Sequence, residues 1–382
     1  MPVPAFVVAV SLFLVTIAVN LEVPLYRTYA QAVGYGNGLT AVVFSAYVAG
    51  LLPVLIFFGG ISDRLGRKPV LLLGMVSATL ATGLVIVSPN IHTLFLSRIL
   101  QGVGVGLSVG AGTAYLAELL GRTNGPTRAA NYAAITTSLG LGSGALLTSA
   151  ALLQKKTLVP LSYWGVLVMT LLCMVGAIIL PASQKPSTSS RLLRLPYFPS
   201  GTSEFGLAIA VAWAITGLII AILPAQLSHH HLDMWTGPAV FLAIGTGAFV
   251  QPLAKHLGSN RSLMSGFVLL TLAYIFLVVG VWLGIVSLII GGSAIAGAAC
   301  FGFTYLGGLT AVSEAGGQER ARAVSGYFLF AYLGLGLPSI LVGFLADQVG
   351  VLNALVGFGS IIIVANAWLG YQLRVRSIRN SL

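Results

Sequence analysis

The segment RILQGVGVGLSVGAG, residues 98–112, contains residue types that could support three different functions. Its alternating glycines suggest a loop that binds phosphate through backbone N–H groups. Residues 106–110, GLSVG, match the G-x-S-x-G pattern of a serine hydrolase, which would make Ser108 a nucleophile. The long apolar run is instead typical of a membrane-spanning helix, in which Arg98 and Gln101 are exceptions. The surrounding elements must decide between these interpretations.

A second pair of polar residues in apolar surroundings is Asn20 and Glu22. A charged side chain near the centre of a bilayer costs roughly 2.5–3.5 kcal/mol on insertion scales, so it usually faces a cavity or a partner. Such a carboxyl group could carry a proton. Two structural roles stay open as alternatives: Arg98 could brace two helices, and Glu22 could reach the outer surface of the membrane.

The composition favours the membrane interpretation. The chain has 382 residues, of which 57% are hydrophobic and 7% charged, and its mean hydropathy is +0.98. An ordinary soluble domain carries about 25% charged residues. No Walker lysine follows the glycines of residues 98–112, and Ser108 has apolar residues on both sides where an elbow needs a strand-to-helix turn. The chain also lacks DDxxD and HExxH motifs, so we expect neither an enzyme nor a cofactor.

Apolar runs of about 20 residues recur along the whole sequence, which is the length of a helix that crosses a bilayer. Continuous runs of this kind argue against a β-barrel, whose strands alternate in polarity. We therefore predict an all-α polytopic membrane protein. The twelve expected spans are residues 4–27, 39–60, 69–88, 91–119, 129–153, 159–181, 204–227, 237–254, 263–282, 284–312, 322–346 and 350–372.

The distribution of Lys and Arg predicts the orientation, because basic residues in short loops stay on the cytoplasmic side. With the N-terminus inside, fifteen basic residues fall in inner segments and three in outer loops, namely Arg27, Lys155 and Lys156. Both termini are therefore predicted to be cytoplasmic. The net charge of +11 then reflects topology and contact with the anionic inner leaflet of the lipid bilayer, and needs no nucleic acid to explain it.

The chain divides into two related halves. A Pro- and Ser-rich stretch predicts a cytoplasmic linker at 182–203 between six-span halves at 1–181 and 204–382. RAANYAAITTSLGLGSGALL from Arg128 aligns with RAVSGYFLFAYLGLGLPSIL from Arg322, and GGISDRLG aligns with QPLAKHLG and GFLADQVG. Repeats of six spans are the architecture of secondary transporters, with the site between the repeats.

GGISDRLGRK after the second span resembles the G-x-x-x-D-R-x-G-R-[RK] signature of the major facilitator superfamily. The resemblance implies a twelve-helix fold of two six-helix halves. It also implies that this loop acts as a gate that latches the halves in the outward-open state. The matching residues are Gly59, Asp63, Arg64, Gly66, Arg67 and Lys68.

SRILQGVGVG resembles the R-x-x-Q-G-x-G pattern of the same superfamily, which is prominent in its drug/proton antiporters. One departure weakens this assignment, because Ala145 stands where the antiporter signature of the fifth span has proline. The resemblance also implies that aromatic residues of certain spans face the substrate cavity. These are Tyr47, Trp213, Phe301, Tyr305, Tyr327 and Phe330.

The spans place the two charged residues at similar depth. The fourth span begins near Ile91, so Arg98 lies about 10 Å into the membrane at 1.5 Å per residue. The first span ends near Tyr26, which gives Glu22 a comparable position. We predict that Glu22 carries the proton and Arg98 modulates it, with Gln101 orienting the guanidinium and Asn20 beside Glu22.

Together these features predict a transporter in the bacterial-type inner (plasma) membrane, monomeric, that exports small drug-like or metabolite molecules in exchange for protons. Uptake by proton symport or facilitated diffusion is the alternative within transport. A membrane sensor that transports nothing is the alternative of another class. The histidines of SHHHLD, His229 to His231, are adjacent in sequence and so converge poorly on a metal, and we expect no metal site.

Overall fold

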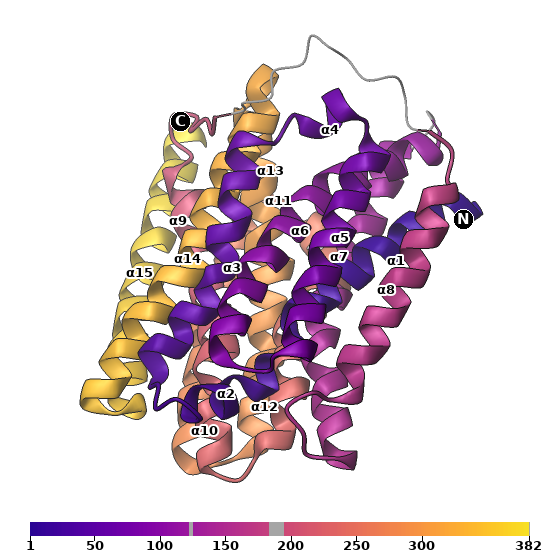
Figure 1. Ribbon diagram of the computed structural model, residues 1–382. Coiled ribbons are helices and arrows are strands. Elements are labelled where there is room, and N and C mark those ends of the chain that lie inside the picture. The colour runs from indigo at the N-terminus through magenta and orange to yellow at the C-terminus, as the bar shows by residue number, and fades with distance from the viewer. Residues whose placement is uncertain (122–124, 183–194, 382) are drawn as a thin grey trace. The chain divides into compact units, whose positions relative to one another are not determined.

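The computed structural model describes residues 1–121, 125–182 and 195–381, and within these ranges it contains helices and no strand (Figure 1). The prediction of an all-α fold is therefore confirmed. The elements are α1 (Val3–Ile17), η1 (Ala18–Asn20), η2 (Val23–Leu25), α2 (Tyr26–Gln31), α3 (Asn37–Phe57), α4 (Ile61–Leu65), α5 (Arg67–Val87), α6 (Ile91–Leu119), α7 (Gly125–Gln154), α8 (Leu161–Ile179), α9 (Ser203–Ala221), α10 (Leu223–His229), η3 (Asp233–Trp235), α11 (Thr236–Leu283), α12 (Val286–Gly297), η4 (Ala298–Thr304), α13 (Tyr305–Ala315), η5 (Gly317–Glu319), α14 (Arg320–Val349) and α15 (Val351–Ser381).

Twelve helical stretches of the described residues are long and apolar enough to cross a membrane, as predicted. They include 29 residues at Ile91–Leu119, which contain the whole of the segment 98–112. That segment is therefore a membrane helix, and neither a phosphate loop nor a serine elbow. The eighth and ninth spans, Asp233–Leu257 and Ser259–Leu283, meet at Gly258 inside α11.

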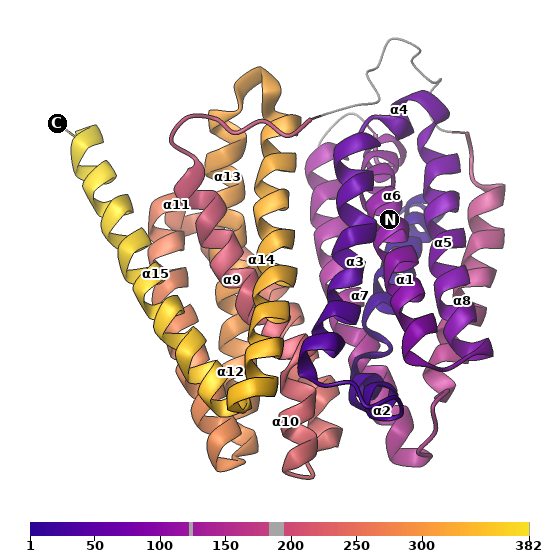
Figure 2. The ribbon, with the colours of Figure 1, turned by 60° about the vertical axis from the view of Figure 1, so that its left-hand side comes forward.

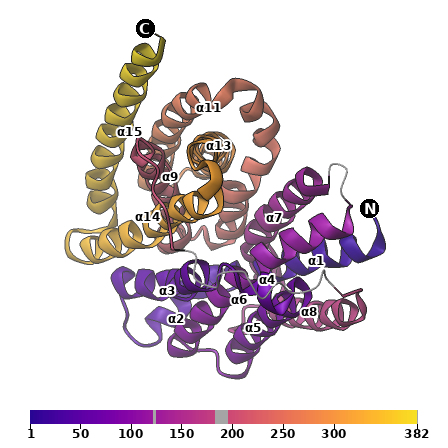
Figure 3. The ribbon, with the colours of Figure 1, turned by 90° about the horizontal axis from the view of Figure 1, so that it is seen from above.

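The described chain forms two compact units, one of residues 1–29 and 46–195 and the other of residues 30–45 and 196–382. In the first unit, α1 packs on α6, α7 and α8, and α5 packs on α6. In the second unit, α13 lies between α9, α11 and α14, which is visible in the view from above (Figure 3). α15 runs along α11 and α14 at the edge of this unit (Figure 2).

The three short segments that align in sequence share one backbone conformation at their last residue. Gly66 has φ 93° and ψ 151°, Gly258 has φ 72° and ψ 164°, and Gly350 has φ 86° and ψ 150°. This region of φ and ψ is essentially restricted to glycine, because a Cβ atom would clash with the backbone. The alignment of GGISDRLG, QPLAKHLG and GFLADQVG therefore reflects a repeated structural element, a turn between two membrane spans.

The longer pair of aligned segments also occupies equivalent positions. Gly140 of α7 lies against α1, where an added Cβ would be 2.1 Å from Thr16 Oγ1. Gly334 of α14 lies against α9, where an added Cβ would be 2.3 Å from the carbonyl oxygen of Ala210. In each case the glycine of the LGLG sequence lets the fifth span of a half approach its first span closely.

Asp347 at the end of α14 caps the start of α3 within the second unit. Its Oδ1 accepts hydrogen bonds from the backbone N–H of Asn37 (2.8 Å) and from Asn37 Nδ2 (3.0 Å). Its Oδ2 accepts a hydrogen bond from the backbone N–H of Gly38 (2.9 Å). A carboxylate at this position satisfies two N–H groups that the first turn of a helix leaves without partners, and it stabilises the positive end of the helix dipole.

Replacing Asp347 with Ala should loosen the start of α3. The loss of a capping side chain costs about 1 kcal/mol, so we expect the amides of Asn37 and Gly38 to exchange hydrogen about fivefold faster. Hydrogen exchange followed by mass spectrometry of the purified protein measures this. Gln348→Ala, at the neighbouring exposed residue, is the control and should leave the exchange rates as they are. Equal rates in both variants would show that the cap contributes nothing.

The predicted orientation can be tested at two exposed residues. We expect Lys155→Cys, after α7, to react with a membrane-impermeant maleimide in intact cells, because this loop is predicted to face outward. Gln318→Cys, in η5, should react only in inverted vesicles. Both variants are made with Cys173 and Cys300 changed to Ala. The opposite pattern would reverse the orientation. The basic residues Arg122, Lys185, Arg191 and Arg194 also enter this prediction but lie outside the described residues.

Candidate functional site

The first membrane span is broken at the level of the predicted polar site. α1 ends at Ile17 and is followed by the 3-10 segments Ala18–Asn20 and Val23–Leu25, with Glu22 between them. Pro24 lacks an N–H group and so cannot donate to the preceding turn. Such a break frees backbone carbonyl groups, which must find other partners inside a membrane.

Two polar side chains of α6 supply those partners. Arg98 Nη1 donates to the carbonyl oxygen of Val19, and Gln101 Nε2 donates to that of Ala18 (3.0 Å). Arg98 is completely buried, and its guanidinium lies over the rings of Tyr47 (5.2 Å) and Tyr26 (5.8 Å). Electrostatic attraction between a cation and the face of an aromatic ring stabilises this arrangement.

Gln101 connects the two charged residues that the sequence placed at similar depth. Its Oε1 accepts a hydrogen bond from Arg98 Nη1 (3.0 Å), and its Nε2 donates to Glu22 Oε1 (2.8 Å). Ser97 Oγ, one turn earlier on α6, accepts from the same amide group (3.3 Å). The structure therefore brings Glu22, Arg98 and Gln101 into one hydrogen-bonded cluster, which we call the α1–α6 polar cluster.

Glu22 is unusual among the acidic residues of the chain. All eight of them lie in the described ranges, and Glu22 is the only one that is buried. Its second oxygen, Oε2, is buried and has no hydrogen-bond partner among the described residues. The hydroxyl group of Tyr26 is also buried, with no hydrogen-bond partner among the described residues. The carboxyl oxygen of Glu22 can therefore bind a proton, and both groups can form a hydrogen bond with a water molecule or a polar substrate atom.

Asn20 lies in the same helix break but has a different partner. Its Nδ2 donates to the carbonyl oxygen of Leu141 on α7 (2.7 Å), so it connects α1 to α7. Tyr29 similarly donates to the carbonyl oxygen of Leu158 (2.6 Å), before α8. The residues that sequence reasoning missed here are Tyr26, Tyr29 and Tyr163. Tyrosines near a span end are common, so no sequence signal distinguishes these three.

The gating motif comprises the turn after α3, the helix α4 and the start of α5. Asp63 is half-buried in the first turn of the five-residue helix α4, and Gly66 is the N-cap residue that precedes α5. Arg67 pairs with Glu118 at the end of α6 (2.7 Å) and donates to the carbonyl oxygen of Ala114 (2.7 Å). Lys68 Nζ donates to the carbonyl oxygens of Ile178 and Leu180. Exposed Gly59 and Arg64 complete the motif.

Two ion pairs lie at the ends of helices in the described part of the chain. Glu118 pairs with Arg67, and Glu319 pairs with Arg322 (3.2 Å). The sequence also allows a pair between Glu118 and Arg122, but Arg122 lies outside the described residues. The basic residues of the gating motif thus attach its loop to the ends of α6 and α8 inside the first unit.

An aromatic cluster occupies the second unit. The Trp213 ring on α9 lies 5.4 Å from Phe301 in the π-helical segment η4 and 5.0 Å from Tyr332 on α14. Phe328 continues the cluster towards Tyr305 (6.1 Å) and Tyr327 (6.2 Å). The structure therefore joins four of the six predicted cavity residues, Trp213, Phe301, Tyr305 and Tyr327, and adds Phe328 and Tyr332.

Trp213 is more than nine-tenths buried, and its indole N–H has no hydrogen-bond partner among the described residues. A buried indole usually finds an acceptor, so this donor is available to a ligand. Of the remaining predicted cavity residues, Tyr47 lies against Arg98 in the first unit and Phe330 contacts Phe198 instead of the aromatic cluster.

The residues that could hold a metal do not converge in the described part of the chain. No group of three or more His, Cys, Asp or Glu side chains there is arranged around a common point. His229 and His230 contact each other edge to face at 5.3 Å. Cys173 and Cys300 are free thiols, and Cys300 donates to the carbonyl oxygen of Ala212 (2.9 Å) in the protein interior.

Comparison with protein families matches residues 8–337 to the model of the Major Facilitator Superfamily. The chain is 22% identical over 219 residues to the quinolone resistance protein NorA of Staphylococcus aureus, and this alignment covers 56% of the chain and 54% of NorA. It is 31% identical over 91 residues to the multidrug resistance protein MdtL of Shewanella oneidensis, and this alignment covers 24% of the chain and 23% of MdtL. The alignments thus span about half or less of these curated relatives.

Solved structures share the fold at low sequence identity. The nucleoside transporter NupG superimposes with a TM-score of 0.76 at 12% identity, covering 97% of this chain and 99% of NupG. The human organic anion transporter MFSD10 superimposes with a TM-score of 0.56 at 16% identity, covering 97% of this chain and 100% of MFSD10. Both confirm the predicted twelve-helix transporter fold. NupG and MFSD10 are transporters, and the matching family is one of transporters, in agreement with the expectation that the chain is a transporter and not an enzyme.

Proposed function

Because the chain belongs to the major facilitator superfamily and is therefore a membrane transporter, we propose that it exports small organic molecules with an aromatic ring in exchange for protons. The observation that supports proton exchange is the position of Glu22. Among the described residues it is the only buried acid, it lies in a helix break, and one of its carboxylate oxygens has no hydrogen-bond partner there.

The proposed coupling step takes place in the α1–α6 polar cluster. Glu22 binds a proton when the site faces outward and releases it inward, while substrate and proton compete for the same carboxyl group. Arg98 modulates this exchange through Gln101, whose amide contacts both residues. A substrate that displaces the proton must leave before the next proton binds, and this competition couples the two fluxes.

The aromatic cluster supports the proposed substrate class. Trp213, Phe301 and Tyr332 present ring faces and edges to which an aromatic substrate can stack. The free indole N–H of Trp213 can donate to a carbonyl or ether oxygen of such a substrate. NorA is named for resistance to quinolones and NupG for transport of nucleosides, and both classes of molecule contain planar rings.

The proposed transport cycle is alternating access between the halves 1–181 and 204–382, joined by the linker 182–203. The gating motif around Asp63 would latch the cytoplasmic side. The chain would act as a monomer in the plasma membrane with both termini in the cytoplasm, an orientation that rests on its Lys and Arg distribution.

Purified protein in liposomes tests the proposal. The probe is ethidium, an aromatic cation whose charge does not change with pH. Proton exchange predicts that ethidium accumulates in liposomes with an acidic interior, because protons leave as ethidium enters. Liposomes without protein are the control. Absence of accumulation in response to either direction of the pH gradient would overturn proton coupling.

One observation favours proton symport as a second candidate. The antiporter pattern has a proline where this chain has Ala145, and α7 is a helix from Gly125 to Gln154. Symport predicts accumulation in liposomes with an alkaline interior. The same assay therefore distinguishes the two modes by the direction of the gradient.

A further inference from the structure

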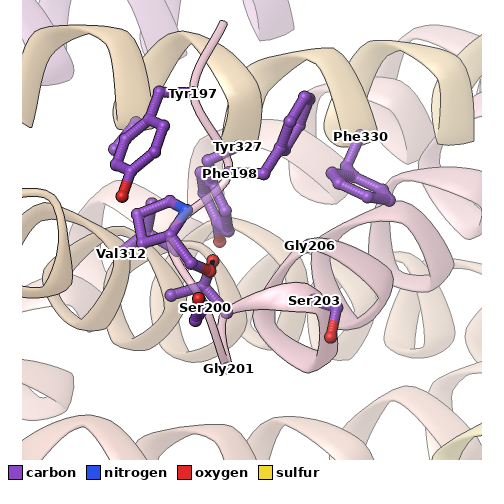
Figure 4. Close-up of a pocket in the computed structure, with 12 residues that line it drawn as sticks. Tyr197, Phe198, Ser200, Gly201, Ser203, Gly206, Val312, Tyr327 and Phe330 are labelled. Atoms are coloured by element: carbon purple, nitrogen blue, oxygen red, sulfur yellow. Dashed lines mark hydrogen bonds between the residues drawn. The ribbon is translucent and has the colours of Figure 1, made fainter. Parts of the chain in front are cut away.

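A pocket of about 260 Å³ lies in the second unit, apart from the residues assigned above to proton exchange. Its walls come from the segment before α9, from the start of α9, and from α13 and α14. Figure 4 shows the rings of Tyr197, Phe198, Tyr327 and Phe330 on one side of this pocket, with Ser200 and Gly201 on the other. We call it the α9–α14 pocket.

The wall formed by residues 197–202 is held in place by specific contacts. The backbone N–H of Tyr197 donates to the carbonyl oxygen of Arg322 (3.1 Å), and the Phe198 ring meets the Phe330 ring edge to face at 5.8 Å. Gly326 allows this close approach, because a Cβ there would lie 2.7 Å from the carbonyl oxygen of Tyr197. Gly206 likewise leaves room for the ring of Phe330. The pocket is therefore built into the packing of α9 and α14.

Its lining indicates the chemistry of an occupant. None of the twelve lining residues is charged, so a charged ligand would lose its hydration without gaining a partner. Four of them are aromatic, and five carry a hydroxyl group. Aromatic rings favour an aromatic ligand, and hydroxyl groups favour one with a polar substituent over the hydrocarbon tail of a lipid.

The volume of the pocket and the exposure of its rim residues agree with a small ligand. An engineered cavity of about 150 Å³ holds benzene, so 260 Å³ has room for one or two aromatic rings. Phe198 is 53% exposed and Tyr197 40% exposed at the rim, although both are large apolar groups. A ligand in the pocket would cover part of this surface.

We propose that the α9–α14 pocket binds a small, uncharged aromatic molecule with a polar substituent. With the orientation predicted from Lys and Arg, this end of α9 faces the cytoplasm. The pocket then captures substrates at the side from which an exporter takes them up, a role that rests on the proposed function. Tyr327 lines the pocket and also contacts Phe328 of the aromatic cluster, so the two sites are adjacent.

Photolabelling tests the proposal. The probe is 4-hydroxybenzophenone at pH 6, where its phenol group is protonated and the molecule is uncharged. On illumination its ketone reacts with nearby C–H groups. We expect saturable labelling of the full chain in phospholipid nanodiscs, at residues 197–206 or 312–330, and competition by 2-naphthol. Val312→Phe, which fills the pocket from α13, should lower labelling about tenfold, as expected for the loss of roughly 1.4 kcal/mol.

A second variant and a control keep the result interpretable. Phe198→Ala removes a half-exposed wall residue, so it should fold and should also lower labelling. Val356→Phe makes the same change as Val312→Phe at a half-exposed position of α15 and should label like the unchanged chain. Adducts elsewhere, or equal labelling in all variants, would overturn the proposal. So would labelling that added phospholipid suppresses and 2-naphthol does not, because a lipid tail would then be the occupant.

Labelling requires no pH gradient and no transport. A failure of ethidium accumulation would therefore count against the proposed proton exchange and leave the pocket assignment intact. If the unchanged chain accumulates ethidium normally but is not labelled in the pocket, the result would count against the pocket assignment alone.

Discussion

Glu22→Gln is expected to abolish the accumulation of substrate in response to a pH gradient, while exchange of substrate across the membrane continues. Glutamine has the shape of glutamate, and its amide oxygen can still accept the hydrogen bond that Gln101 Nε2 donates to Glu22 Oε1. It cannot bind and release a proton. With one proton exchanged per ethidium cation, no net charge crosses the membrane, so one pH unit corresponds to about 1.4 kcal/mol and supports about tenfold accumulation. The Glu22→Gln variant should show no accumulation in response to the gradient.

The measurement is uptake into liposomes with and without an imposed gradient. Glu314→Gln is the matched control, because Glu314 is an exposed acid at the end of α13 and its change should leave accumulation intact. A thermal unfolding curve of each purified variant verifies that both are folded. If Glu22→Gln still concentrates substrate as the unchanged chain does, another group carries the proton.

Asp63→Asn should insert into the membrane normally but transport much more slowly. The substitution preserves the shape of the side chain in the first turn of α4 and removes its negative charge. The charge is expected to stabilise the closed cytoplasmic gate. A coupling free energy of 1–3 kcal/mol between the gate and the transport site corresponds to a transport rate that is roughly 5- to 150-fold lower. Initial rates of ethidium uptake, normalised to the amount of protein, measure the effect.

The control for this variant is Asp233→Asn. Asp233 is exposed in η3, between α10 and α11, outside the gating motif, so its loss of charge should not change the rate. Unchanged uptake in Asp63→Asn would remove Asp63 from the gating mechanism and leave it as a surface residue of a basic loop.

The twelve spans could be predicted from the sequence because a bilayer imposes a local rule. Every backbone N–H and C=O inside the hydrocarbon must find a partner, so a long apolar run can only be a helix there. The repeats were predictable for the same reason, since a turn that needs glycine at Gly66, Gly258 and Gly350 leaves a mark in the sequence. The depth of Glu22 and Arg98 followed from counting residues along two helices.

The partners of those residues were not predictable. The break of the first span exposes the carbonyl oxygens of Ala18 and Val19, and these are bound by side chains about 80 positions away in the chain. Gln101 was expected to orient Arg98, but its second contact, with Glu22, depends on the distance between α6 and the break. Glu118 pairs with Arg67 for the same kind of reason, because the gating loop returns to the end of α6.

The sequence by itself determined which residues are buried in the membrane and on which helix, because hydropathy and helical geometry act over neighbouring residues. Only the tertiary structure decided that Phe328 and Tyr332 join Trp213, that Phe330 lines the α9–α14 pocket, and that Asp347 caps α3. The rotation of each helix about its axis selects these neighbours. That rotation depends on the packing of side chains from distant segments, to which the hydropathy of a single span is insensitive.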